Sequence, residues 1–141
     1  MMKKVAVVYW SGTGNTEAMA ISVADGAKAK GADVSLFTSG DFNADMVKDY
    51  DSIAFGCPSM GDEVLEESEF QPMFDTCKGK LGGKKVALFG SYGWGDGEWM
   101  RNWEAECADL GVDMACDPVI CNEMPDDSGK AECQSLGASL A

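Results

Sequence analysis

The sequence SGTGNT, residues 11–16, is a run of small and hydroxyl-bearing residues that carries no charge. It lies between the apolar stretch VAVVYW and a segment with helical periodicity. Because the first N–H groups of a helix have no intrahelical acceptor, a loop in this position is suited to bind an anion. The loop itself adds side-chain donors, which are Ser11, Thr13, Asn15 and Thr16. Gly12 and Gly14 lie between them and let the backbone approach a ligand closely.

The loop lacks residues that two common nucleotide-binding motifs require, and this limits the kind of anion it could bind. Without a lysine it is not the nucleotide-binding loop GxxxxGK[ST], and with Glu17 at the third glycine position it is not the dinucleotide motif GxGxxG. Its dense set of side-chain donors suits a terminal phosphate monoester. The alternative is a tight strand-to-helix turn in which Asn15 or Thr16 is an ordinary N-cap, which would account for only one of these donors.

Two more glycine-rich loops each carry one large apolar side chain: CPSMGDE, residues 57–63, and GSYGWGDG, residues 90–97. Met60 and Trp94 lie outside any periodic apolar stripe, so no core position is predicted for them. Both could stack on a flat ligand, while Trp94 could instead fold back over the protein's own core. Trp10, at the end of the first apolar run, fits either interpretation.

Acidic residues crowd these two loops, namely Asp62, Glu63, Asp96 and Glu98. A solvated acidic face is the ordinary interpretation. Around a redox-active ring, however, the same charges would oppose reduction and lower the reduction potential. A phosphate-binding loop, two apolar plates and an acidic surround together describe a site for FMN.

Near-continuous apolar runs predict strands buried on both faces of a parallel sheet: VAVVYW, VSLF, SIAFGC, KVALFG and the weaker VDMACDPVIC. Helical segments alternate with them, and they are expected before Gly31, over about Leu65 to Cys77, over Glu98 to Leu110 and from about Asp126. This alternation predicts one α/β domain over residues 1–141, a doubly wound five-stranded parallel sheet with helices on both faces. Ligands bind such a sheet at the carboxyl ends of its strands, where the three loops should meet.

The 24 acidic and 11 basic residues leave a formal net charge of −13. This charge would repel nucleic acids and anionic membranes, so we expect protein partners with basic surfaces. We expect the protein itself to be a monomer. The N-terminal apolar run is too short for a signal peptide, and no run of about 20 apolar residues predicts a membrane span. The six cysteines form no C-x-x-C pair and the chain has no histidine, so we expect no metal site. Without a signal peptide or a membrane span, we expect a cytoplasmic protein whose cysteines are free thiols.

Three segments carry a resemblance to a known family: VVYWSGTGNTEAMA, GCPSMGDEVLEESEFQPM and GKKVALFGSYGWGDGEWMRNWE. They resemble the three FMN loops of short-chain flavodoxins, most of all the clostridial type, and the similarity spans nearly the whole chain. The resemblance implies the strand order 2-1-3-4-5 with FMN at the point where the order reverses, an arrangement for which flavodoxin is itself a standard example.

The resemblance also implies roles for single residues. Phosphate contacts would come from the first loop, and Met60 and Trp94 would cover opposite faces of the isoalloxazine ring. Glu63 would bond to the N3 side of the ring, and the turn at Gly61 would rearrange beside N5 on reduction. The remaining binding positions implied by the family are Pro58, Ser59, Asp62, Ser91, Tyr92, Gly93, Gly95 and, more weakly, Asn122.

Pro58 departs from the family pattern, in which a serine often follows the cysteine of the second loop. Proline has neither a hydroxyl nor a backbone donor, so one phosphate contact is in question there. Ser59 is the residue that could replace it.

The expected function is that of a low-potential electron carrier, which moves electrons on non-covalently bound FMN between larger redox partners and has no catalytic residues. An FMN-dependent reductase of quinones or another small acceptor is the alternative on the same fold, and it would need room for a second planar molecule beside the ring. A phospho-acceptor receiver domain also has a doubly wound sheet. Its metal-binding carboxylates are missing from the corresponding positions, which are Trp10-Ser11 and Cys57-Pro58.

Overall fold

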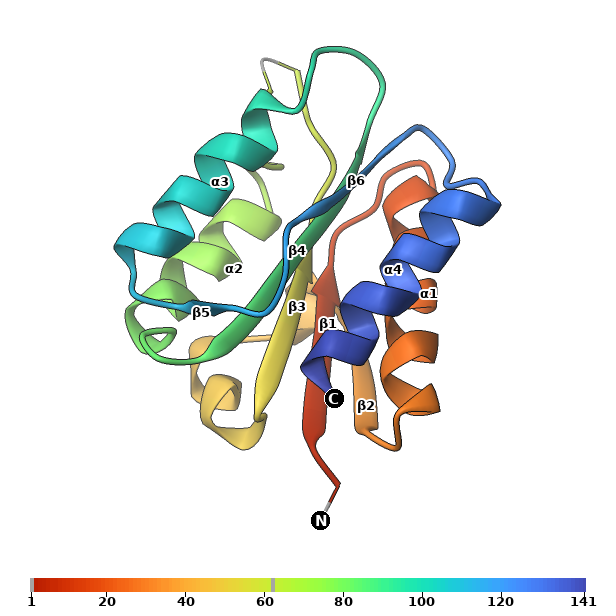
Figure 1. The fold of residues 1–141 in the computed structure, drawn as a ribbon. Coiled ribbons are helices and arrows are strands. Elements are labelled where there is room, and N and C mark those ends of the chain that lie inside the picture. The colour runs from red at the N-terminus through yellow and green to blue at the C-terminus, as the bar shows by residue number, and fades with distance from the viewer. Residues whose placement is uncertain (1, 62) are drawn as a thin grey trace.

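A computed structural model of the chain describes residues 2–61 and 63–141. A parallel sheet lies between two layers of helices (Figure 1). The strands are β1 (Lys4–Tyr9), β2 (Asp33–Thr38), β3 (Ser52–Gly56), β4 (Lys85–Tyr92), β5 (Asp113–Met114) and β6 (Val119–Asn122). The α-helices are α1 (Asn15–Ala29), α2 (Phe70–Cys77), α3 (Glu98–Asp109) and α4 (Asp127–Leu140), and the short 3-10 helices are η1 (Ser39–Asp41), η2 (Ala44–Asp49) and η3 (Lys78–Lys80).

The strand order is β2-β1-β3-β4-β5, which confirms the doubly wound sheet and the order implied by the resemblance. The paired strands are parallel, and the expected fifth strand is split into two pieces that both pair with β4. β5 pairs at Lys85 and Val86, and β6 pairs further along, from Phe89 to Tyr92. Pro118 lies in the break, where a residue without a backbone N–H cannot add to the ladder.

Alternate residues of the central strands face opposite helical layers. In β1, Val5 and Val7 belong to a core with α1 and α4, while Ala6 and Val8 belong to a core with α2 and α3. Because both faces of these strands are buried, apolar residues occupy both faces, and the sequence of each strand is a nearly continuous apolar run.

Helices α1 and α4 pack closely because each has a glycine at the contact. A Cβ added at Gly26 would overlap the backbone of Gln134, and one added at Gly137 would overlap the backbone of Val23. At its far end α4 is tied to the sheet, since the Ser52 hydroxyl donates to the carbonyl of Leu140 at 2.7 Å. The last helix is therefore held by both the first helix and the sheet.

Helix α2 begins at Phe70 and not near Leu65, because the side chain of Glu66 turns the chain first. This carboxylate is buried, with 7% of the residue exposed, and it accepts the N–H groups of Ser68, Glu69 and Phe70 at 3.0, 2.7 and 2.8 Å. It thus acts as a cap for donors at the start of a helix. Burial opposes ionisation, but the N–H donors outweigh it, and the pKa of Glu66 lies below its usual value.

We expect Glu66→Gln to lower the free energy of unfolding by about 2 kcal/mol at neutral pH, because hydrogen bonds to a charged group contribute about 1.5–3 kcal/mol. A carboxyl group with a lowered pKa stabilises the fold above its unfolded pKa, and this contribution is lost as the pH falls through the folded pKa. The difference in the free energy of unfolding between variant and parent should therefore shrink as the pH is lowered. Urea unfolding at several pH values measures this difference.

The matched control is Glu67→Gln, the same change at the exposed neighbour, which should alter the free energy of unfolding by less than about 0.5 kcal/mol. Equal effects of the two variants, or a difference from the parent that does not change with pH, would show that the Glu66 carboxylate is not the cap.

Candidate functional site

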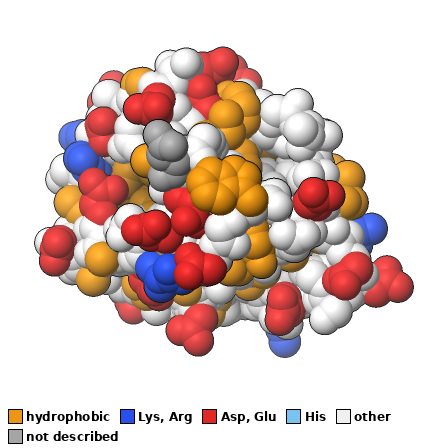
Figure 2. Space-filling model, turned by 90° about the horizontal axis from the view of Figure 1, so that it is seen from above, with side chains coloured by type: hydrophobic (Ala, Val, Ile, Leu, Met, Phe, Trp, Pro, Cys, Tyr) orange, Lys and Arg blue, Asp and Glu red, His pale blue; other side chains and the backbone are white. Residues whose placement is uncertain are grey.

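The carboxyl ends of β1, β3 and β4 bring the three glycine-rich loops together at one end of the sheet, the top in Figure 1. The loops enclose a cavity of about 460 Å³, within the range of small-molecule sites. Its lining combines hydroxyl, amide and aromatic groups: Trp10, Gly12, Thr13, Asn15, Pro58, Ser59, Met60, Ser91, Tyr92, Gly93 and Glu123. Figure 2 shows this end of the molecule, with apolar side chains near the middle and acidic side chains scattered around them.

The first loop leads into α1 without a side-chain cap. Gly14 is the N-cap residue and has a φ of 95°, a left-handed conformation that glycine adopts freely. Its N–H donates to the Ser11 hydroxyl at 3.0 Å, and the Ala18 N–H bonds to the Gly14 carbonyl. Neither Asn15 nor Thr16 caps this helix, so the capping interpretation is wrong. The N–H groups of the first turn remain suited to an anion.

Thr16 lies behind the cavity and not in its wall. The residue is 1% exposed, and its hydroxyl is 2.8 Å from the hydroxyl of Ser91 in β4. This contact joins the first loop to the strand that leads into the third. Thr16 therefore fixes the position of one loop relative to another.

The second loop continues the ladder between β3 and β4. The N–H groups of Cys57 and Ser59 donate to the carbonyls of Phe89 and Ser91 at 3.1 and 2.9 Å. Backbone groups of successive strand residues point to opposite sides, so position 58 faces away from β4, toward the first loop. Pro58 thus costs no bond to β4 but removes a donor on the side of that loop, and Ser59 lines the cavity beside it.

The tip of the second loop is a tight turn. Met60 lines the cavity, and it exchanges backbone hydrogen bonds of 2.9 and 3.2 Å with Val64. Gly61 has a φ of 35° within this turn. Asp62 lies outside the described residues, and so does the Gly61–Asp62 peptide that was expected to rearrange.

The side chain of Glu63 joins the second loop to the third. Its carboxylate accepts the Glu98 N–H at the start of α3 at 3.1 Å. A Cβ added at Gly95 would lie only 2.5 Å from the same carboxylate oxygen, so the third loop packs directly on it. In this structure Glu63 does not line the cavity.

The third loop presents Trp94 to solvent. The residue is 64% exposed, so the interpretation as a lid over the protein core is wrong. The preceding Gly93 lines the cavity, and Trp94 itself does not. In helix α3, Arg101 Nη2 lies 2.9 Å from the carboxylate of Asp96 in the third loop and pairs with one of the acidic charges at this end.

Two residues of the cavity lie outside the predicted set. Trp10 packs against the core and also lines the cavity, its ring 3.0 Å from where a Cβ on Gly12 would lie, so both interpretations of this tryptophan hold in part. Glu123 was not predicted, although it follows the last strand at the carboxyl edge where ligands bind. Its φ is 58°, and its N–H donates to the Tyr92 carbonyl at 2.8 Å. The neighbouring Asn122 is exposed and does not line the cavity.

The six cysteines are free thiols, as predicted. Burial raises the pKa values of Cys107 and Cys133 to about 12, so both thiols are protonated at neutral pH. Across residues 2–61 and 63–141, no cluster of three or more potential ligands could hold a metal ion. Over the same residues, no helix is both long and apolar enough to cross a membrane.

Comparison with known proteins gives a consistent result. The model of the family described as flavodoxin matches residues 7–137. The chain is 50% identical to flavodoxin from Megasphaera elsdenii over 137 residues, which is 97% of this chain and 98% of the relative. It is 47% identical to flavodoxin from Clostridium beijerinckii over 135 residues, covering 96% and 97% of the two chains.

Solved structures show the same similarity. The solution structure of two-electron reduced Megasphaera elsdenii flavodoxin matches with a TM-score of 0.90 at 50% identity, covering 96% of this chain and 97% of that one. A flavodoxin from the domain Archaea matches with a TM-score of 0.85 at 31% identity, covering 98% and 96%. These relatives do not favour the alternative of a reductase for small acceptors. The chain therefore belongs to the flavodoxin family, whose members bind FMN and carry electrons to and from redox proteins without being enzymes themselves.

Proposed function

We propose that this chain is a low-potential electron carrier that holds FMN among its three glycine-rich loops and serves redox partners with basic surfaces. The observation that carries this proposal is the convergence of the three loops on one cavity. The uncapped start of α1 lies on one side of that cavity, and the exposed Trp94 follows a glycine of its wall. FMN supplies the electron-accepting ring when it is bound, and the chain positions it and sets its surroundings.

The donors of the first loop fit the phosphate of FMN. Thr13 and Asn15 line the cavity, and Ser11 accepts the Gly14 N–H through oxygen while its own proton is free to be donated. The N–H groups at the start of α1 add donors and a partial positive charge. Thr16 supports this arrangement from behind through Ser91.

The second and third loops fit the ring. Met60, Tyr92 and Gly93 line the cavity, and Trp94, the residue after Gly93, is exposed, so its indole is available to stack on a flat ligand. We include Gly61, Gly95, Glu63, Asp62 and Asn122 among the ring and ribityl contacts because they occupy the family's binding positions. For Glu63 this requires its carboxylate to exchange the Glu98 N–H for the ligand.

A low reduction potential follows from the charges around this end. Glu123 lines the cavity, and the chain has a formal net charge of −13. An added electron is repelled by such surroundings, which favours the oxidised form. The same charges favour basic partner surfaces and keep copies of the chain apart, so we propose a monomer. The six free thiols fit a reducing compartment such as the cytoplasm.

We expect Thr13→Ala to weaken FMN binding by about 1 kcal/mol or more, roughly a fivefold rise in Kd, because a hydrogen bond to a charged phosphate is lost. Riboflavin lacks the phosphate, so its affinity should not change. Fluorescence titration with both ligands measures the two affinities.

The control for this variant is Thr38→Ala, an exposed threonine at the end of β2, which should leave both affinities at parental values. A parent that binds riboflavin as tightly as FMN would contradict the phosphate role of the first loop.

We expect Trp94→Ala to raise the fluorescence of bound flavin, because a stacked indole quenches it, and to weaken binding through loss of the aromatic contact. Trp94→Phe keeps a stacking ring and should retain most of the affinity. If the alanine variant keeps both the parental fluorescence and the parental affinity, Trp94 does not stack on the ring.

We expect electron transfer from the reduced protein to a basic c-type cytochrome to slow as salt is added, because ions at physiological strength screen charges beyond about 8 Å. Stopped-flow rates over a range of ionic strength measure this dependence. A neutral quinone as acceptor is the control and should give rates that do not change with salt. Equal salt dependence for both acceptors would remove electrostatic steering as the explanation.

A further inference from the structure

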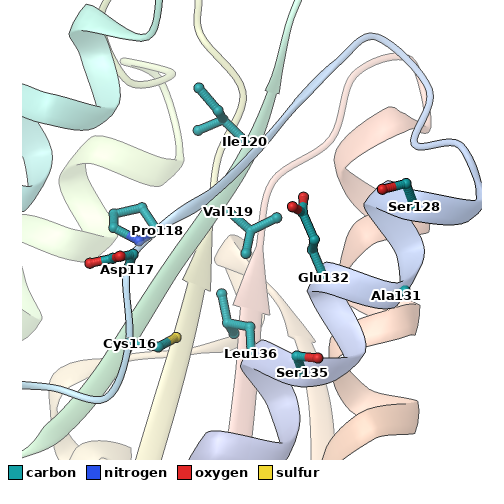
Figure 3. Close-up of a pocket in the computed structure, with 10 residues that line it drawn as sticks. All are labelled: Cys116, Asp117, Pro118, Val119, Ile120, Ser128, Ala131, Glu132, Ser135 and Leu136. Carbon is teal, nitrogen blue, oxygen red and sulfur yellow. The ribbon is translucent and has the colours of Figure 1, made fainter.

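A second concave surface lies between β6 and α4, separate from the cavity among the three loops (Figure 3). Its volume is about 670 Å³, larger than the 460 Å³ of the cavity among the loops. Residues 116–120 form one wall and one face of α4 forms the other. Of the predicted FMN-site residues that the structure describes, none lines this groove.

The strand side of the groove is a free backbone edge. Of the five residues in this wall, Val119 and Ile120 belong to β6, while residues 116–118 precede it outside any strand. Within the described residues, β6 pairs with β4 alone. The Glu123 N–H donates toward β4, so by alternation Ile120 and Asn122 point their N–H and C=O groups away from it, toward the free edge. Pro118 lies on the same side and contributes only its carbonyl.

The helical side of the groove leaves room for another chain. Ser128, Ala131 and Ser135 have small side chains and follow the spacing of one helix face. Val119 and Leu136 give the groove an apolar part, and Figure 3 shows both side chains between strand and helix. The groove thus offers backbone hydrogen bonds along one side and apolar contact within.

The charge of the groove selects the kind of chain. Asp117 and Glu132 are its charged lining residues, one on each wall, and no lysine or arginine lines it. Figure 3 shows the Glu132 side chain projecting into the gap between strand and helix. A basic segment would be attracted here, while a second copy of this chain would bring the same acidic residues face to face.

One end of the groove lies close to the electron-transfer end of the molecule. Ile120 is within 3.1 Å of where a Cβ on Gly97 would lie, and Gly97 is the N-cap of α3 at the end of the third loop. β6 ends at Asn122, and the next residue, Glu123, lines the cavity among the loops. A chain lying along β6 would therefore point toward the cavity among the three loops.

We propose that the groove between β6 and α4 binds an extended basic segment of a partner protein, which adds as a strand to the free edge of β6. Main-chain hydrogen bonds would fix the segment, and its lysine or arginine side chains would meet Asp117 and Glu132. This contact surface for a partner lies outside the proposed FMN site, and the proposal does not depend on the residues assigned to FMN.

The test uses the isotope-labelled, FMN-loaded protein and a peptide of four Lys-Val repeats at about 0.15 M salt, where distant charges are screened. We expect amide shift changes in NMR spectra that are confined to residues 116–122 and the facing side of α4. A peptide with the same sequence and alternate backbone nitrogens methylated keeps its charge but loses its strand-pairing donors, and it should not bind. Shifts that map to the loops or to β2, the opposite edge of the sheet, would overturn the proposal, as would equal binding of the methylated peptide.

Charge reversal supplies a second readout. Glu132→Lys should weaken peptide binding by at least about fivefold, which corresponds to roughly 1 kcal/mol. The control is Asp33→Lys, the same reversal at the exposed start of β2, and the flavin absorbance of both variants reports that the fold is intact. Equal weakening by both variants would mean that the peptide responds only to net charge. Formation of a dimer by the parent protein in sedimentation, lost in Glu132→Lys, would assign the groove to a second copy of the chain and overturn the basic partner.

Discussion

The hydrogen-bond ladder between β3 and β4 continues past the end of β3, and the geometry of the site depends on it. Through Cys57 and Ser59 the second loop leaves the sheet still in register with Phe89 and Ser91. The hydroxyl contact between Thr16 and Ser91 then ties the first loop to the same strand. Loops that are far apart in the sequence are thus fixed relative to one another mainly by backbone bonds. Their side chains are left free to face a ligand.

The proposed function places two opposing electrostatic demands on the protein. A phosphate must be held in a molecule with a formal net charge of −13, yet a full positive charge beside the ring would make reduction easier. In the proposed site, neutral donors and the partial charge at the start of α1 would satisfy the first demand without violating the second. Arg101, the cation near the third loop, is paired with Asp96. Anion binding and a low potential are therefore compatible in one small site.

The sequence predicted the strands, the four helices and the three loops because each depends on a local pattern. Continuous apolar runs, helical spacing and glycine-rich segments all lie within a few residues. The start of α2 was misplaced because Glu66 is a buried carboxylate, and glutamate is ordinarily a surface residue. The split of the last strand had a visible signal in Pro118, which was read as part of one weak strand.

The side-chain contacts of the site were harder to predict than its location. Glu63 lies 35 residues from Glu98 in the sequence, and only the fold brings its carboxylate to the start of α3. Trp10 could not be assigned to core or cavity because it contacts both. Glu123 belongs to a fourth loop with no glycine-rich pattern, so its place in the cavity depends on strand order alone.

The glycine contact between α1 and α4 bears on how the molecule forms during synthesis. α1 begins at the proposed phosphate site, and its flank is covered by α4, which is synthesised after every described strand of the sheet. Until then Val23 and its neighbours face water where α4 will lie, although β1 and the first loop have long since been made. A nascent chain can therefore form most of its sheet without a firmly seated cofactor-binding helix. In the proposed site, tight retention of the flavin therefore depends on α4 having joined the fold.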